Sequence, residues 1–229
     1  MIFLIQTIEN TIKHDFSFTL LEAIEYHKWY GHMDIEYVLS EKPCIANCIP
    51  VGSVEFVSEY LNTFHNKTPL PLNIPTCLFP FAKRCIINGN QNDVYENSFV
   101  KSNDKIKSFT KIVDKSNITN VPQGNYQISE LIDIESEWRA FVYKNELVGL
   151  NNYSGEFTVF PDVNTVNNMI NVFKDNGAPV AYTLDVGIFN NLTVPIEVHD
   201  FFSCGLYGFA DLNLLPWMYF QWFKEFISK

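Results

Sequence analysis

The sequence predicts an α+β protein built from more than one subdomain. At the start of the chain, apolar runs typical of strands enclose a stretch with helical spacing. A segment with four prolines, at 69, 71, 75 and 80, then interrupts regular structure. Beyond it, short apolar runs separated by polar turns predict an antiparallel sheet. Alternating layers followed by an antiparallel section are typical of α+β architecture.

The first part of the chain has the pattern of a small α/β layer. Apolar side chains recur at helical spacing from Val54 to Phe64, and we expect Ser53 to cap this helix. The other elements expected here are a helix at 18–30 and strands at 2–6, 35–39 and 44–51. The proline-rich segment is the expected boundary, which gives an N-terminal α/β domain at 1–75 and a second domain at 76–229.

The second part combines an antiparallel section with two more helices. Its expected strands lie at 98–101, 111–113, 126–132, 137–143, 146–150, 181–189 and 194–198. The last two strands form a hairpin around Asn190 and Asn191, and a helix at 164–175 precedes them. The aromatic segment at 214–229 is interpreted as a packed amphipathic helix. An interfacial membrane helix is the alternative, which the lack of a basic face disfavours.

Composition and charge narrow the class of protein. With 229 residues, 47% of them hydrophobic, the chain can bury a substantial core. A net charge of -10 repels a phosphate backbone, so we expect no nucleic-acid partner. The five scattered cysteines are not typical of a disulfide framework, and the sequence shows neither a secretion signal nor a long apolar span. We therefore expect a cytoplasmic protein with no membrane partner.

Three lysines surround one polar turn after the strand at 98–101. Lys101 lies in that strand on the same face as Phe99, and Lys105 and Lys107 lie in the turn. Three cations around one turn can close over a polyphosphate. The alternative is a solvated basic turn, which the absence of glycine from the turn favours.

A glutamate and an arginine share one face of the strand at 137–143. Strand parity places Glu137 and Arg139 on one face and Trp138 on the other. A carboxylate can accept bonds from two ribose hydroxyls, and an arginine can bind a phosphate in bidentate fashion, so the pair suits a nucleotide. The alternative is a cross-strand ion pair on the solvated face of a sheet.

Two carboxylates meet across the hairpin of strands 181–189 and 194–198. Asp185 lies in the first strand and Glu197 in the second, with His199 on the face of Glu197. Asp200 lies on the opposite face or just past the strand end. Paired carboxylates in apolar strands predict a site for a divalent metal ion. The alternative is a pair of carboxylates at a sheet edge.

The loop that follows the hairpin contains Gly205 and Gly208, which permit close approach of the backbone to a ligand. The alternative is an ordinary tight turn, which two glycines taken alone favour. The sequence contains neither the phosphate-binding P-loop pattern nor the Rossmann glycine pattern, so these two nucleotide folds are disfavoured.

Four segments, taken in chain order, resemble the ATP-grasp superfamily and within it the clade named for one arginine and two lysines. The segments are IPVGSVEFV, FVKSNDKIKSFT, ISELIDIESEWRAFV, and AYTLDVGI together with PIEVHDFFSCGLYG. Glu130 and Glu137 are seven residues apart, as are the adenine-hinge and ribose glutamates of the D-alanine ligase branch. The resemblance implies an ATP-grasp fold with a reduced N-terminal α/β layer and antiparallel-sheet nucleotide-binding subdomains.

For the phosphates of ATP, the resemblance implies four basic residues. Lys101 would contact the α-phosphate. Lys107, or Lys105 in its place, would cover the β- and γ-phosphates. Arg139 would contact the phosphates or an acyl phosphate, and Arg139 and Lys107 are the expected catalytic residues.

For the nucleoside, the resemblance implies Glu130 with the backbone of Leu131 and Ile132 at the adenine, and Glu137 at the ribose. For Mg²⁺ it implies Asp185 and Glu197. The family usually has asparagine where this chain has His199, and imidazole is a softer ligand than Mg²⁺ prefers. Three alternatives follow: Asp200 substitutes for the asparagine, His199 supports the metal ligands without binding the ion itself, or the metal site is altered.

The resemblance implies an ATP-dependent carboxylate-amine ligase that works through an acyl phosphate, with ATP and Mg²⁺ held between two sheets. Its partners would be a small-molecule or peptide carboxylate and an amine acceptor, and the oligomeric state is open. The alternative is a catalytically inactive nucleotide-binding or scaffold protein, which His199 and the glycine-poor turn motivate. Asn151, Asn152 and Tyr153, after the strand at 146–150, are the expected substrate-facing patch.

Overall fold

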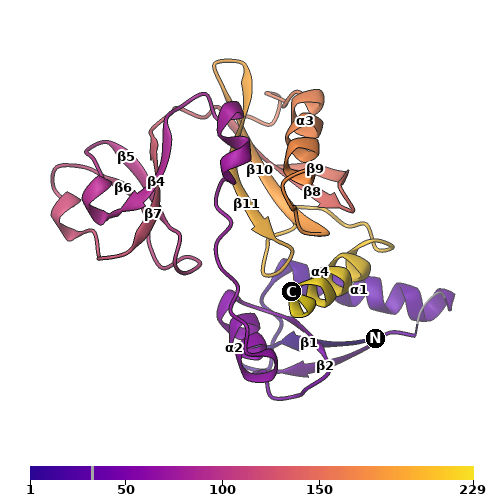
Figure 1. Cartoon of the computed structure of the whole chain (residues 1–229). Coiled ribbons are helices and arrows are strands. Elements are labelled where there is room, and N and C mark those ends of the chain that lie inside the picture. Colours follow the sequence, from indigo (N-terminus) through magenta and orange to yellow (C-terminus); the bar gives the residue numbers. More distant parts are fainter. Residues whose placement is uncertain (32–33) are drawn as a thin grey trace.

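The structure is a computed structural model that describes residues 1–31 and 34–229. Within these ranges the chain forms three β-sheets, one parallel and two antiparallel (Figure 1). The longer helices are α1 (Asp15–Tyr30), α2 (Val54–His65), α3 (Val163–Lys174) and α4 (Leu215–Ser228). The predicted α+β class is confirmed.

The parallel sheet belongs to the N-terminal layer. Strand β1 (Ile2–Gln6) lies between β2 (Glu36–Ser40) and β3 (Ile49–Val51) and runs parallel to both. Parallel neighbours need a long crossover connection, which α1 supplies between β1 and β2. Helix α2 begins after Ser53, whose hydroxyl oxygen accepts a bond from the N–H of Phe56 at 3.2 Å, as the N-cap prediction requires.

The predicted strand at 44–51 is wrong in its first half. Only Ile49–Val51 pair with β1, and residues 44–48 form a loop. Pro43 precedes this loop, and Asn47 has a left-handed φ of 60°, a conformation that a strand does not contain. Cys44 is consequently exposed, whereas Cys48 packs in the core.

The larger antiparallel sheet, called the central sheet below, has the strand order β11-β10-β8-β9. Its strands are β8 (Ser136–Tyr143), β9 (Glu146–Gly155), β10 (Ala181–Phe189) and β11 (Leu192–Asp200). The turn residues Lys144, Asn145, Asn190 and Asn191 all have left-handed φ angles, as two-residue hairpins require. The predicted hairpin of β10 and β11 is confirmed, and β8 and β9 form a second hairpin around Lys144 and Asn145. Strand β9 continues five residues past its predicted end and includes Asn151, Asn152 and Tyr153.

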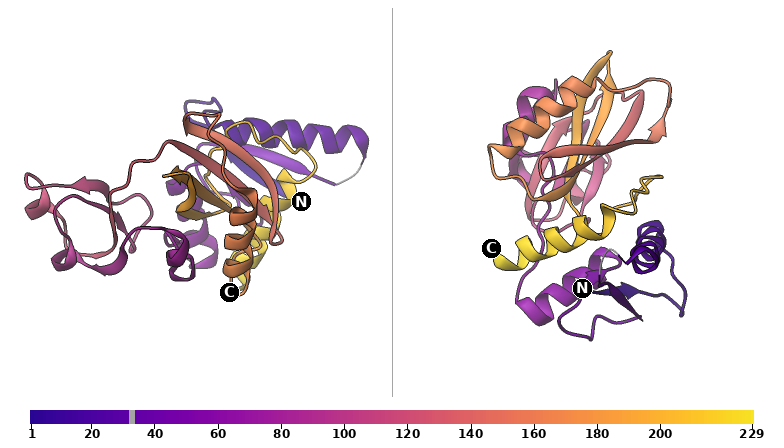
Figure 2. Two further views of the ribbon diagram at one scale, coloured as in Figure 1. Left: turned by 90° about the horizontal axis from the view of Figure 1, so that it is seen from above. Right: turned by 90° about the vertical axis from the view of Figure 1, so that its right-hand side faces the viewer.

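The two faces of the central sheet pack on different partners. Trp138, Ala140 and Val142 point into a core formed with α3 and the 3-10 helix η1 (Thr76–Phe81), whereas Phe141 points toward the N-terminal layer. Strand parity predicted this division. Figure 2 shows α4 lying between the central sheet and the N-terminal elements.

Helix α4 buries one face of its aromatic residues, as expected for a packed amphipathic helix. Tyr219 and Trp222 are almost fully buried in the core that α4 shares with α1, α2 and the central sheet. None of the helices in the described ranges is both long and apolar enough to cross a membrane.

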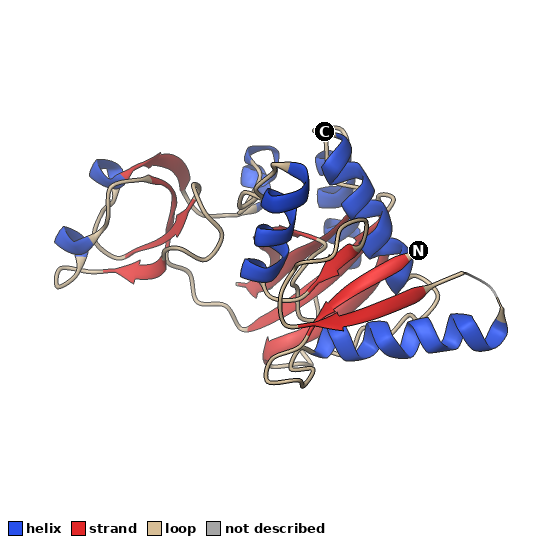
Figure 3. Ribbon diagram, turned by 90° about the horizontal axis from the view of Figure 1, so that it is seen from below, coloured by secondary structure: helices blue, strands red, loops and turns tan. Residues whose placement is uncertain are grey.

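The second antiparallel sheet, called the small sheet below, has the order β4-β7-β5-β6. Its strands are β4 (Ile86–Asn90), β5 (Ser98–Ser102), β6 (Thr110–Val113) and β7 (Asn125–Glu130). It carries only the short 3-10 helices η2 (Gln91–Asp93) and η3 (Ile118–Asn120), so its core is small (Figure 3). Strand β4 is missing from the predicted elements because Asn88, Gly89 and Asn90 disfavour a strand.

Candidate active site

A cavity of about 1000 Å³ lies between the small sheet and the central sheet. Its wall comes from β5, β6, the end of β7, β8, β9 and β11, and from neighbouring loops. Nine of the predicted site residues line it: Lys101, Lys107, Glu130, Leu131, Ile132, Glu137, Arg139, Glu197 and His199. Lys105, Asp185 and Asp200 are not part of this wall.

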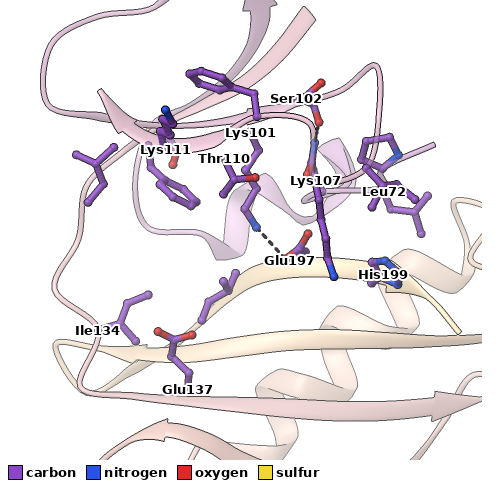
Figure 4. A pocket seen from close by; sticks show the side chains of 18 of the residues that line it. Leu72, Lys101, Ser102, Lys107, Thr110, Lys111, Ile134, Glu137, Glu197 and His199 are labelled. Carbon is purple, nitrogen blue, oxygen red and sulfur yellow. Dashed lines mark hydrogen bonds and ion pairs between the residues drawn. The ribbon is translucent and has the colours of Figure 1, made fainter. Parts of the chain in front are cut away.

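An ion pair joins the two sheets across the cavity. The Nζ atom of Lys101 in β5 lies 2.9 Å from Oε2 of Glu197 in β11 (Figure 4). The Lys101 side chain is only 12% exposed, which excludes a solvated surface lysine at this position. Part of each side chain still faces the cavity, so an entering phosphate can bind the ammonium group directly.

The turn between β5 and β6 places one of its two lysines in the cavity. Lys107 adopts a left-handed φ of 57° and extends its side chain toward the strand that carries Glu197 and His199 (Figure 4). Lys105 precedes it at an exposed position, and its carbonyl oxygen accepts a bond from Ser108. Of the two turn lysines, the structure thus brings Lys107 to the site.

Arg139, in the cavity wall, forms a bidentate ion pair with the buried carboxylate of Asp185. Nε and Nη2 of Arg139 lie 2.8 and 2.7 Å from the two carboxylate oxygens of Asp185, and Nη1 donates to the carbonyl of Gly205. The side chains are 12% and 6% exposed. Burial alone lowers the pKa of Arg139, but the bonds to Asp185 more than offset it and raise the pKa above its ordinary value.

Two tyrosines complete the wall beside Arg139. The hydroxyl of Tyr153 donates to Oε2 of Glu137 at 2.6 Å, and its ring stacks on Tyr207 with the centroids 5.0 Å apart. The guanidinium carbon of Arg139 lies 5.0 Å from the Tyr207 centroid. Burial, the charge of Asp185 and the bond to Glu137 all raise the pKa of Tyr153, so its hydroxyl remains a donor.

The end of β7 offers unused backbone groups to a ligand. Glu130 pairs with Cys85 through two bonds, one from the N–H of Cys85 to its carboxylate and one from its own N–H to the Cys85 carbonyl. In the described part of the chain, the Leu131 carbonyl and the Ile132 N–H have no backbone partner. A donor and an acceptor beside a glutamate match the hydrogen-bonding edge of adenine.

The side chains of His199 and Asp200, at the end of β11, lie in different environments. Nδ1 of His199 lies 2.6 Å from the Asp200 carbonyl, so Nδ1 carries the proton and Nε2 keeps its lone pair. Burial lowers the pKa of His199. The carboxylate of Asp200 instead accepts a bond from the Trp222 indole on α4, and burial raises its pKa to about 6. The structure therefore does not bring Asp200 to the predicted metal site.

The donor set fits a metal ion that a nucleotide shares with the protein. The described residues contain no group of three or more His, Cys, Asp or Glu side chains placed to hold a metal ion. Asp185 lies opposite Glu197 in the strand register, as predicted, but Arg139 occupies both of its oxygens. Mg²⁺ is commonly held by one or two carboxylates plus substrate phosphates, and Glu197 can supply such a carboxylate.

The wall also contains residues that are absent from the predicted site, and three of them carry a functional group of interest. Arg84 precedes β4 in a segment whose sequence shows no strand pattern, and Tyr207 lies in the glycine loop after β11. Cys204 in the same loop is buried, which raises its thiol pKa to about 12 and leaves it a neutral group. Charge in an apolar strand or a family resemblance is the signal that found the other residues, and neither signal singles out any of these three.

Comparison with protein families matches residues 81–216 to an ATP-grasp domain, that of family 2 of the clade named for one arginine and two lysines. The chain belongs to this family. The match extends from the segment before β4 through the start of α4 and includes every predicted site residue. The predicted ATP-grasp fold is confirmed, and membership places the chain among ATP-dependent ligases of the ATP-grasp type.

Solved structures share the ATP-grasp fold at low identity. D-alanine–D-alanine ligase from Bacillus anthracis is similar with a TM-score of 0.56 and 10% identity, covering 99% of this chain and 98% of the ligase. The same ligase complexed with ATP gives 0.52 and 11%, covering 99% and 95%. The macrocyclase MdnC from Microcystis aeruginosa, bound with precursor peptide MdnA, gives 0.51 and 10%, covering 96% and 99%. Comparison with curated protein sequences gives no match.

Proposed function

We propose that this ATP-grasp protein is a carboxylate-amine ligase that uses ATP to convert a carboxylate into an acyl phosphate. The observation that carries the proposal is the contact of Lys101 with Glu197 across the cavity between two sheets. It brings a phosphate-binding cation and a metal-binding carboxylate to one point. The B. anthracis ligase complexed with ATP has the same fold, which supports a nucleotide at this position.

The nucleoside would occupy the end of the cavity next to β7. Glu130 and the free backbone groups of Leu131 and Ile132 would bind the hydrogen-bonding edge of adenine. Glu137 would accept bonds from the ribose hydroxyls with the carboxylate oxygen that Tyr153 leaves free. Ile134 and Ile196, which line the same end, supply apolar surface for the base.

The phosphates would extend from there toward Lys107. Lys101 would bind the α-phosphate, and Lys107 would cover the β- and γ-phosphates from the turn above (Figure 4). Lys105 would take this place only after a change in the turn. Glu197 would hold Mg²⁺ together with the phosphates, and Asp185 would join it only where Arg139 releases an oxygen. Bound Mg²⁺ supplies neutralisation of the phosphate charge.

The reaction needs positioned charges and no side-chain nucleophile. A substrate carboxylate oxygen attacks the γ-phosphorus of ATP, the bond to the β,γ-bridging oxygen breaks, and ADP leaves. The amine then attacks the acyl carbon, the carbon-oxygen bond to phosphate breaks, and the amine proton passes to solvent. Arg139 and Lys107 would bind the transferred phosphoryl group during both steps. The neutral thiol of Cys204 is consistent with a mechanism without a covalent enzyme intermediate.

The proposed substrates are a small-molecule or peptide carboxylate and an amine. The named activity of the D-alanine ligase joins small molecules, and the macrocyclase is bound with a precursor peptide. Tyr207, at 46% exposure, and the neighbouring Tyr153 form an aromatic wall beside Arg139, where an organic carboxylate can pack.

The position of Asp185 favours a second candidate, a nucleotide-binding protein without ligase activity. Both oxygens of this carboxylate are engaged by Arg139, so of the two carboxylates expected to bind the metal, Asp185 and Glu197, only Glu197 faces the cavity. Such a protein would bind ATP but would not release ADP in the presence of a carboxylate and an amine.

One labelling experiment separates the two candidates. The protein is incubated with ATP, Mg²⁺ and pools of carboxylates, short peptides and amines, and ADP release is measured. The active carboxylate is then supplied with ¹⁸O. The ligase predicts one ¹⁸O atom in the phosphate product and loss of ADP release in Glu197→Gln. ADP release without transfer of ¹⁸O contradicts the acyl phosphate, and ATP binding without any ADP release supports the second candidate.

A further inference from the structure

Arg84 places a cation in the cavity wall. Within the described residues, no carboxylate lies within ion-pair distance of its guanidinium, and no charge raises its pKa, which burial lowers. Its bonds go to two backbone carbonyls, from Nη2 to Pro195 at 3.1 Å and from Nη1 to Ala82 at 3.3 Å. Five N–H groups are available on a guanidinium, so several remain for a ligand.

The contacts of its neighbours place Arg84 at the nucleoside end of the cavity. Cys85, the next residue, exchanges two hydrogen bonds with Glu130. Pro195, which receives the Nη2 bond, precedes the cavity residue Ile196. Figure 4 shows Ile134 and Glu137 on one side of the Lys101–Glu197 contact and Lys107 with His199 on the other. Arg84 therefore lies with the residues proposed for adenine, away from the turn lysine.

The surroundings of Arg84 suit a flat ring better than a phosphate. The apolar residues of this end supply no further cation that could help Arg84 to bind a phosphate. They are Leu131, Ile132, Ile134 and Ile196. A guanidinium is planar, weakly hydrated and stacks on aromatic faces. The bonds to Ala82 and Pro195 hold it from two sides, so it does not have to be ordered when a ligand enters.

We propose that Arg84 is a base-binding residue whose guanidinium stacks on the purine of the nucleotide. The inference rests on the proposed function and adds to it a specificity-determining contact from the segment before β4. The phosphate cations would then be Lys101, Lys107 and Arg139, and Arg84 would bind only the base.

The test compares a ligand that has the base with one that lacks it. Binding of ATP and of inorganic tripolyphosphate, each with Mg²⁺, is measured by calorimetry for the wild type, Arg84→Leu and Arg84→Lys. Lys83→Asn is the matched control, because it removes the adjacent charge at an exposed position, and asparagine tolerates its left-handed φ of 54°. Circular dichroism checks that the variants are folded.

Stacking predicts a loss that is specific to the base. Arg84→Leu should bind ATP roughly tenfold more weakly and tripolyphosphate as the wild type does. Arg84→Lys should also weaken ATP binding, since it keeps the charge and loses the plane, whereas Lys83→Asn should change neither ligand. Equal losses for ATP and tripolyphosphate, or no loss for ATP, overturn the assignment of Arg84. A wild type that binds neither ligand refutes the proposed function itself, and this inference with it.

Discussion

The buried pair of Arg139 and Asp185 gives a prediction about stability that also bears on the metal site. Their side chains are 12% and 6% exposed and share two hydrogen bonds of 2.7 and 2.8 Å. Removal of one partner leaves an uncompensated charge in the protein interior, which costs about 3–5 kcal/mol of unfolding free energy. Arg139→Met and Asp185→Asn should each show such a loss in the absence of nucleotide.

The double variant distinguishes the interaction between the two side chains from the contribution of each side chain alone. In Arg139→Met/Asp185→Asn no unpaired charge remains, so its loss should be well below the sum of the two single losses. For a chain of this size, about 1 kcal/mol corresponds to a shift of about 2–4 °C in melting temperature, so each single variant should melt roughly 6–20 °C lower. Urea unfolding followed by circular dichroism gives the free energies, and thermal scans give the shifts.

A surface ion pair provides the control for this measurement. Lys115 and Glu96 lie 4.0 Å apart with side chains 86% and 44% exposed, so Lys115→Met should cost less than about 1 kcal/mol. If Asp185→Asn costs no more than this control, or if the single losses simply add, Asp185 is not held by Arg139. Its carboxylate would then be available to Mg²⁺ in the unliganded protein.

Two other variants test single contacts of the site region. Tyr153→Phe removes the hydroxyl that holds Glu137, so the KM for ATP should rise several-fold with kcat little changed; an unchanged KM contradicts the positioning of Glu137. Burial raises the pKa of Asp200 to about 6, so the folded protein binds this proton more tightly than the unfolded chain. The wild type should therefore lose up to about 3 kcal/mol relative to Asp200→Asn between pH 4 and pH 7 in denaturant titrations. A pH-independent difference between the two proteins contradicts the raised pKa.

The strands and the charged residues inside them were the most predictable features of this chain. Strand parity places Glu137 and Arg139 on one face, and hairpin register places Asp185 opposite Glu197, and the structure has both arrangements. These predictions depend on the two-residue alternation of side chains along a strand, which can be read from the sequence alone. The same reasoning fails at 44–48, where Asn47 breaks an apolar run through its own backbone conformation.

Contacts between distant segments were not predictable from a single sequence. The engagement of Asp185 by Arg139 depends on side chains 46 residues apart, and the bond from Trp222 to Asp200 depends on where α4 packs. Arg84 gives no local signal, because it stands out only through the absence of an acidic partner among the residues that the structure describes. Spacing along a strand fixes the direction of a side chain but not the partner that it meets.

Binding of ATP with Mg²⁺ where the small sheet meets the central sheet can be measured by thermal unfolding. The melting temperature is measured with ATP and Mg²⁺, with ATP and a chelator, and without ligand, for the wild type and Glu197→Gln. Ligand at about 100 times its Kd adds about 2.7 kcal/mol, so the wild type should melt roughly 5–11 °C higher with ATP and Mg²⁺. Glu197→Gln should lose the part of this rise that depends on Mg²⁺. A wild type whose melting temperature does not respond to millimolar ATP and Mg²⁺ would contradict the binding of ATP at this site.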